Sequence, residues 1–140
     1  MALRLFSVTS LFCILVLAGC SGGPSEHAPA ESGSLEDKVA EIVELRNKIR
    51  NGFASDDVEA AHGPLHAVGD TLEELSQLAA DSGLPSASKE AIEGHINTLF
   101  ASFGEVDKTF HGQEGATYDE ESSTIDETME KLVRICKASQ

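Results

Sequence analysis

From residue 35 onward, apolar residues recur every three or four positions, the spacing that gathers them on one face of an α-helix. The first such segment begins at Leu35 and extends for about five turns, to an exit at Gly52 and Ser55. Ser34, with Asp37 three residues later, has the residue types of a helix N-cap. These positions predict an amphipathic helix that begins just after Ser34.

The second segment carries an apolar stripe from Val58 to Ala79, whose spacings alternate between three and four. Such a stripe packs helix against helix. Gly63 and Pro64 interrupt it, because proline lacks an amide hydrogen and its ring collides with the carbonyl four residues earlier. Two interpretations stay open: one kinked helix, or a short turn over residues 55–62 followed by a main helix from Pro64.

Two further stripes follow, over residues 92–110 and 118–136, and a glycine-containing stretch separates them. Thr117, with Glu120 three residues later, has the pattern of a capping box at the start of the last helix. Cys136 completes the last stripe, which predicts that its thiol is a core group.

Four amphipathic segments with short connections predict an all-α domain over residues 35–140, folded as an antiparallel up-down-up-down four-helix bundle. The length suits a single domain of ordinary size. An arrangement of two helical hairpins that dimerises is the alternative, because each hairpin alone would leave its apolar face open.

The first 19 residues have the order of a secretory signal. Arg4 gives a positively charged start, and residues 5–17 are apolar apart from three hydroxyl side chains. This run is shorter than the roughly 20 residues that a membrane-spanning helix needs. It ends in Leu-Ala-Gly-Cys at residues 17–20, which resembles the lipobox of bacterial lipoproteins.

That resemblance implies cleavage before Cys20 and lipidation of its thiol, so that fatty acyl chains hold the mature protein on a membrane. Residues 20–34 are rich in Gly, Pro and Ser and would be a flexible tether. The resemblance places the protein in the cell envelope. Ser21, where an aspartate would favour inner-membrane retention, favours the outer membrane if the host has two membranes.

The chain carries 24 acidic and 10 basic residues, a formal net charge of −14. This charge disfavours binding to nucleic acid or to an anionic lipid surface through a basic patch. The partners we expect are the membrane, through the lipid on Cys20, and an envelope protein or a second copy of the chain.

Histidines are the side chains that could carry chemistry. His62 and His66 are four residues apart, so on an unbroken helix they lie one turn apart and could bind one metal ion such as zinc or copper. Asp70 extends the same row. If a hairpin turns near Gly83, His66 lies across from about residue 100, so His95 lies about one turn from it.

His111 is excluded from that site by the same reasoning, because it lies sixteen residues beyond His95, about 24 Å along the helix. The candidate metal ligands are therefore His62, His66, Asp70 and His95, with surface histidines as the alternative.

Haem is a second alternative, with Met129 and one histidine as the axial pair, although no Cys-x-x-Cys-His attachment motif and no paired Glu-x-x-His motif is present. The sequence also lacks a phosphate-binding loop, a nucleophile elbow and a calcium loop. We therefore expect a binding or interaction module that is not an enzyme and needs no cofactor, with a metal- or haem-binding bundle as the alternative.

Overall fold

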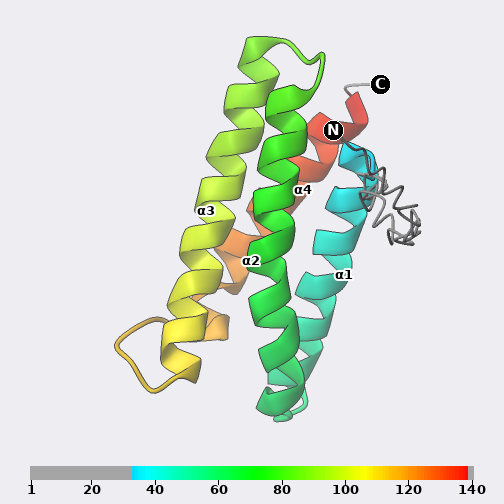
Figure 1. Ribbon diagram of the computed structural model, residues 1–140. Coiled ribbons are helices and arrows are strands. Elements are labelled where there is room, and N and C mark those ends of the chain that lie inside the picture. Colours follow the sequence, from blue (N-terminus) through cyan, green and yellow to red (C-terminus); the bar gives the residue numbers. More distant parts are fainter. Residues whose placement is uncertain (1–32, 139–140) are drawn as a thin grey trace, which may run out of the picture. The chain divides into compact units, whose positions relative to one another are not determined.

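The computed structural model describes residues 33–138 and contains four helices. They are α1 (Leu35–Ala54), α2 (Val58–Asp81), α3 (Ser86–Phe110) and α4 (Tyr118–Ala138) (Figure 1). No strand occurs among these described residues. Residues 1–32, which hold the predicted signal segment, Cys20 and most of the tether, lie outside the described range, so those assignments stay predictions.

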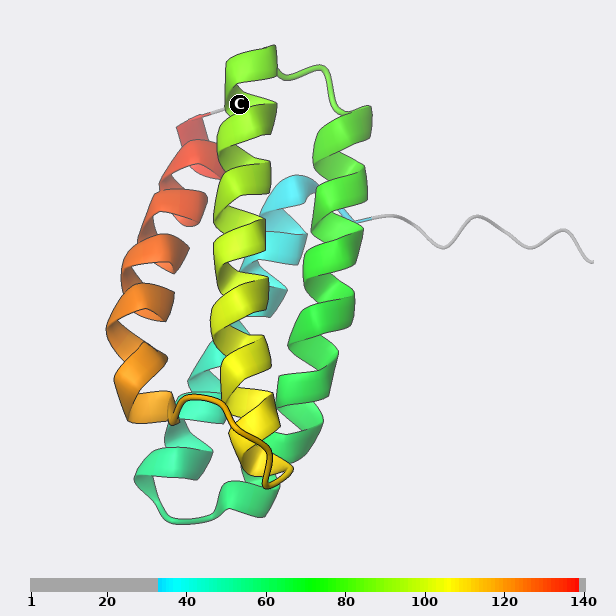
Figure 2. The same cartoon turned by 90° about the vertical axis from the view of Figure 1, so that its left-hand side faces the viewer.

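Successive helices run in opposite directions, as the sequence predicts, and form one bundle (Figures 1 and 2). Each helix packs against two others, in the ring order α1, α2, α3, α4. Within the described range, the backbones of the two diagonal pairs, α1 with α3 and α2 with α4, do not approach each other closely. The four helices of one chain thus cover each other's apolar faces, as in the bundle expected from the sequence.

The four apolar stripes meet in a single core, and most of the residues predicted for it are buried. The largest side chains that are 1% exposed or less are Ile42, Ile49, Val68, Leu72, Leu75, Ile92, Ile96, Leu99, Val106, Ile125, Met129 and Leu132. Cys136 is 4% exposed and belongs to the same cluster, which confirms its assignment as a core residue. Burial raises the pKa of its thiol.

One predicted stripe position is exposed. Val58 is 43% exposed and is the one large hydrophobic side chain with high exposure in the described part of the chain. It is the first residue of α2, at the end of the bundle. Phe110, the last residue of α3, is half-buried there.

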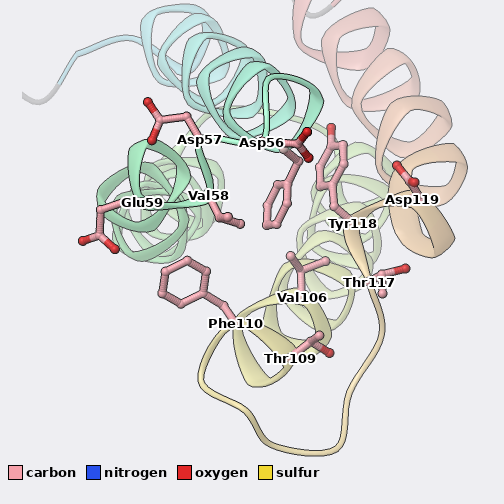
Figure 3. Close-up of a pocket in the computed structure, with 11 residues that line it drawn as sticks. Asp56, Asp57, Val58, Glu59, Val106, Thr109, Phe110, Thr117, Tyr118 and Asp119 are labelled. Atoms are coloured by element: carbon pink, nitrogen blue, oxygen red, sulfur yellow. The ribbon is translucent and has the colours of Figure 1, made fainter.

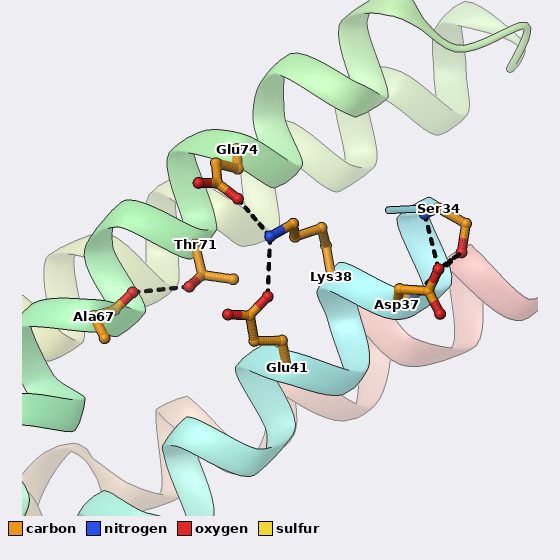
Figure 4. Close-up of polar contacts among 7 residues, drawn as sticks. All are labelled: Ser34, Asp37, Lys38, Glu41, Ala67, Thr71 and Glu74. Atoms are coloured by element: carbon orange, nitrogen blue, oxygen red, sulfur yellow. Dashed lines mark hydrogen bonds and ion pairs between the residues drawn. The ribbon is translucent and has the colours of Figure 1, made fainter. Parts of the chain in front are cut away.

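Both predicted caps at helix starts are present. The Ser34 hydroxyl accepts a hydrogen bond from the Asp37 amide, and the Asp37 carboxylate accepts from the Ser34 amide (Figure 4). Thr117 and Glu120 make the equivalent pair ahead of α4. Hydrogen bonds from Ser34 lower the pKa of Asp37, and those from Thr117 lower the pKa of Glu120.

Polar contacts also join neighbouring helices. Lys38 of α1 pairs with Glu74 of α2 at 2.5 Å (Figure 4). Arg46 of α1 donates to Asp126 of α4 at 2.6 Å, and the Arg46 side chain is only 17% exposed. Both contacts lie beside the core and help to fix which helices are neighbours.

Helix α2 is continuous through Pro64, so the interpretation with a separate short turn over residues 55–62 is wrong. Asp57 caps the helix by accepting from the Ala60 amide. His62 and His66 consequently lie on one unbroken helix. No helix in the described range combines the length and the apolar character needed to cross a membrane.

Candidate functional site

Three histidines from two helices meet at one end of the bundle. His62 and His66 lie one turn apart near the start of α2, and His111 directly follows the last residue of α3. One nitrogen of each ring lies within 4.8 Å of a nitrogen of the other two. The ring centroids are 4.7 Å apart for His62 and His66, 5.3 Å for His62 and His111, and 5.7 Å for His66 and His111. We call these three residues the histidine cluster.

The exclusion of His111 by the sequence argument is therefore wrong. Counting residues from a turn near Gly83 places His66 opposite residue 100, whereas His66 lies 3.5 Å from Asp107. The reason is the direction of side chains on antiparallel helices. Side chains lean toward the N-terminus of their own helix, so those of α2 and α3 lean toward each other along the bundle. A residue of α2 consequently meets residues further along α3 than counting backbone positions from Gly83 predicts.

Asp107 lies between two members of the cluster. Its Oδ1 atom is 3.5 Å from His66 Nε2 and 3.5 Å from His111 Nε2. The same oxygen is shielded from solvent and has no hydrogen-bond partner among the described residues. Asp107 and His111 are four residues apart, so one helical turn aligns them.

The surroundings of His62 fix how its ring is oriented. The ring stacks on Phe110, with centroids 4.5 Å apart and planes 25° apart. Its Nδ1 lies 3.8 Å from Glu59 Oε1. Its Nε2 is buried and has no hydrogen-bond partner in the described part of the chain. Nε2 is therefore the nitrogen of His62 that is available to a ligand.

Two other residues predicted for the metal site lie elsewhere. Asp70 is exposed on α2 and is not part of the cluster. His95 lies in a separate pocket beside Thr98 of α3 and Lys131 of α4. Burial, and the positive charge of Lys131, lower the pKa of His95. The structure brings together only His62 and His66 of the four predicted ligands.

An acidic pocket of about 660 Å³ adjoins the histidine cluster, because Glu59 and Phe110, which both contact His62, are among the residues that line it. Val58, Val106 and Phe110 point into this pocket, and the carboxylates of Asp57 and Glu59 point away from its centre (Figure 3). The pocket thus has an apolar interior and an acidic rim. The carboxylates on the rim are Asp56, Asp57, Glu59 and Asp119. Such a group of like charges raises the local concentration of cations.

Met129, the predicted haem ligand, is 1% exposed in the core. It also lines a groove between α1 and α4, and none of the described residues that line this groove is a histidine. Met129 therefore has no histidine beside it in this groove, and the haem alternative stays a prediction.

Imidazole nitrogens are the donors that zinc, copper and nickel ions prefer in proteins, together with carboxylate oxygen in the case of zinc. The histidine cluster supplies three nitrogens, and Asp107 supplies an adjacent oxygen. Sequence reasoning missed Asp107 and His111. Their spacing of four residues at the end of a predicted helix was the signal that could have found them.

The chain was also compared with known proteins. No protein-family model, no curated protein and no solved structure matches it. The function is therefore inferred below from the residues of the site itself.

Proposed function

We propose that this protein is a lipid-anchored protein of the cell envelope whose helical bundle binds a transition-metal ion through His62, His66 and His111. One observation carries the proposal: three histidine side chains, two from α2 and one from the end of α3, bring their nitrogens within 4.8 Å of one another. His111 lies 45 residues after His66 in the sequence. Its approach to the other two rings does not stabilise the fold through charge, because protonated imidazoles repel one another.

The charge around the cluster also supports a bound cation. Asp107 contacts two of the histidines, and Glu59 lies beside the third. The nearest lysine in the sequence, Lys108, pairs with Glu105 at 2.5 Å. A divalent ion at the cluster would thus be surrounded by carboxylates and by neutral imidazoles.

A binding module that works through a protein partner is the other function expected from the sequence. Large apolar patches are typical of such docking surfaces. In the described residues, Val58 is the one large hydrophobic side chain that is highly exposed. The metal site therefore has more specific support than a protein-docking surface has.

The location in the envelope is proposed from the residues before the bundle, above all the lipobox that ends at Cys20. Helix α1 begins at the end of the bundle where α2 and α3 are connected (Figures 1 and 2). The histidine cluster lies at the opposite end, where α2 begins and α3 ends. A lipid anchor ahead of α1 would leave the cluster at the end of the domain farther from the attachment point.

The test of metal binding is a calorimetric titration of the metal-free mature protein, purified in detergent, with Zn²⁺. We expect one ion per chain. His66→Ala and His111→Ala should each weaken binding at least tenfold, because each removes one of three nitrogens. His95→Ala is the matched control, because it removes a histidine of α3 that does not belong to the cluster. Equal binding by all three variants and the unchanged protein would show that the cluster is not the site.

The anchor is tested separately, in cells that carry out lipoprotein processing. Cys20→Ala should block cleavage of the precursor and abolish incorporation of labelled fatty acid. A variant that is still cleaved and still sediments with membranes would contradict the proposed lipid anchor, whatever the titration shows.

A further inference from the structure

The position of Asp107 agrees with that of a metal ligand. Zinc bonds to histidine nitrogen and to carboxylate oxygen are about 2.0–2.2 Å long, so neighbouring ligand atoms in a tetrahedral site are roughly 3.4 Å apart. Asp107 Oδ1 lies 3.5 Å from the Nε2 atoms of both His66 and His111. Two edges of a tetrahedron are therefore already at the required length.

The polar contacts of this oxygen support the same reading. It is shielded from solvent, and neither histidine nitrogen donates a hydrogen bond to it. A buried carboxylate oxygen without a partner is costly, and a cation bonded to it would remove that cost. His62 Nε2 is a second buried atom without a partner in the described residues, so α2 and α3 each contribute one.

We infer that Asp107 is the fourth protein ligand and that the bound ion is Zn²⁺ in a tetrahedral site of three nitrogens and one oxygen, an inference that rests on the proposed function. The three histidine nitrogens lie within 4.8 Å of one another, a set that does not include Asp107 Oδ1, and all four ligand atoms must close to roughly 3.4 Å. The side chains of His66 and His111 are 58% and 39% exposed. Rotation of these exposed side chains can supply the movement while α2 and α3 stay in place.

The ligand set argues for zinc over other ions. Magnesium and calcium prefer six or more oxygen ligands, and Cu²⁺ prefers a tetragonal arrangement. A tetrahedral set of imidazoles and one carboxylate suits Zn²⁺, which is almost always four-coordinate and tetrahedral in structural sites. Four protein ligands also fill the tetrahedron. The ion then has no open position for a substrate or a reactive water, so the site holds zinc without hydrolytic chemistry.

The experiment replaces zinc by Co²⁺, whose visible absorption reports coordination geometry, in the mature protein purified in detergent. We expect the intense spectrum of a four-coordinate ion and no change on adding azide, because no position is open. Asp107→Asn and Asp107→Ala should bind Co²⁺ at least tenfold more weakly, and azide should alter their spectra by taking the vacated position. Asp70→Ala is the matched control, since it removes an exposed carboxylate one turn from His66 and should change neither affinity nor spectrum.

The outcomes separate this inference from the proposed function. If the unchanged protein takes up no stoichiometric Co²⁺ or Zn²⁺, the proposed metal-binding function fails. If it binds one ion but both Asp107 variants keep the same affinity and spectrum, Asp107 is not a ligand. An azide-sensitive spectrum of the unchanged protein would show an open position and would overturn the closed site. Far-ultraviolet circular dichroism confirms that each variant retains its helices.

Discussion

Zinc should stabilise the folded bundle, and the size of the effect follows from where the ligands lie. His62 and His66 are neighbours in any helical chain, but His111 is 45 residues further along than His66, and only the packing of α2 against α3 brings it to them. The unfolded chain therefore lacks the complete site, so binding of zinc favours the folded state.

At a free zinc concentration one hundred times the dissociation constant, this linkage is worth about 2.7 kcal/mol. In a domain of this size, 1 kcal/mol shifts the midpoint of thermal unfolding by about 4–8 °C. The melting temperature of the mature protein should therefore rise by roughly 10–20 °C. The assay is thermal unfolding followed by circular dichroism, at increasing concentrations of Zn²⁺.

His111→Ala tests the reasoning, because it leaves only the two histidines that a single helix places together. Most of the zinc-dependent shift should disappear in this variant, and His95→Ala should keep all of it. Mg²⁺ at the same concentration is the control for a nonspecific effect, because any divalent cation screens the repulsion within a chain whose formal charge is −14. An equal shift from Mg²⁺, or an undiminished shift in His111→Ala, would refute the cluster as the origin of the stabilisation.

Three predictions concern the bundle itself. Leu72→Ala removes a side chain that is 0% exposed, so urea unfolding should show a loss of about 2–5 kcal/mol; a loss below about 1 kcal/mol would contradict the core. Arg46 and Asp126, 2.6 Å apart and partly buried, should show a coupling of about 1 kcal/mol in a double-mutant cycle, and additive single losses would rule it out. Burial raises the pKa of Cys136 above that of the thiol in the unfolded chain. The contribution of this shift to the free energy of unfolding is complete below about pH 8.5 and is lost as the pH rises through the raised pKa. Cys136→Ala should therefore lose less unfolding free energy than the unchanged protein between about pH 8 and pH 10, and an equal loss in both proteins would contradict this assignment.

Local sequence was sufficient for the helices and the core because both depend on short-range periodicity. Stripes with spacings of three and four define the buried face wherever the chain forms a helix. Ser34 and Thr117 supply hydrogen-bond groups for the starts of their own helices. Even the continuity of α2 through Pro64, which the sequence left open, concerns one helix only. Connections over residues 55–57, 82–85 and 111–117 then favour antiparallel neighbours.

The candidate site depended on a different kind of information. The spacing of His62 and His66 is local, and the sequence found that pair. Which residues of α3 face them depends on how far the two helices slide along each other and on the opposite lean of their side chains. A displacement of a few residues brought Asp107 and His111 to the pair and left His95 beside α4. Periodicity determines which face of a helix is buried, but only the packed bundle determines which residues meet across it, because that register is set jointly by two helices.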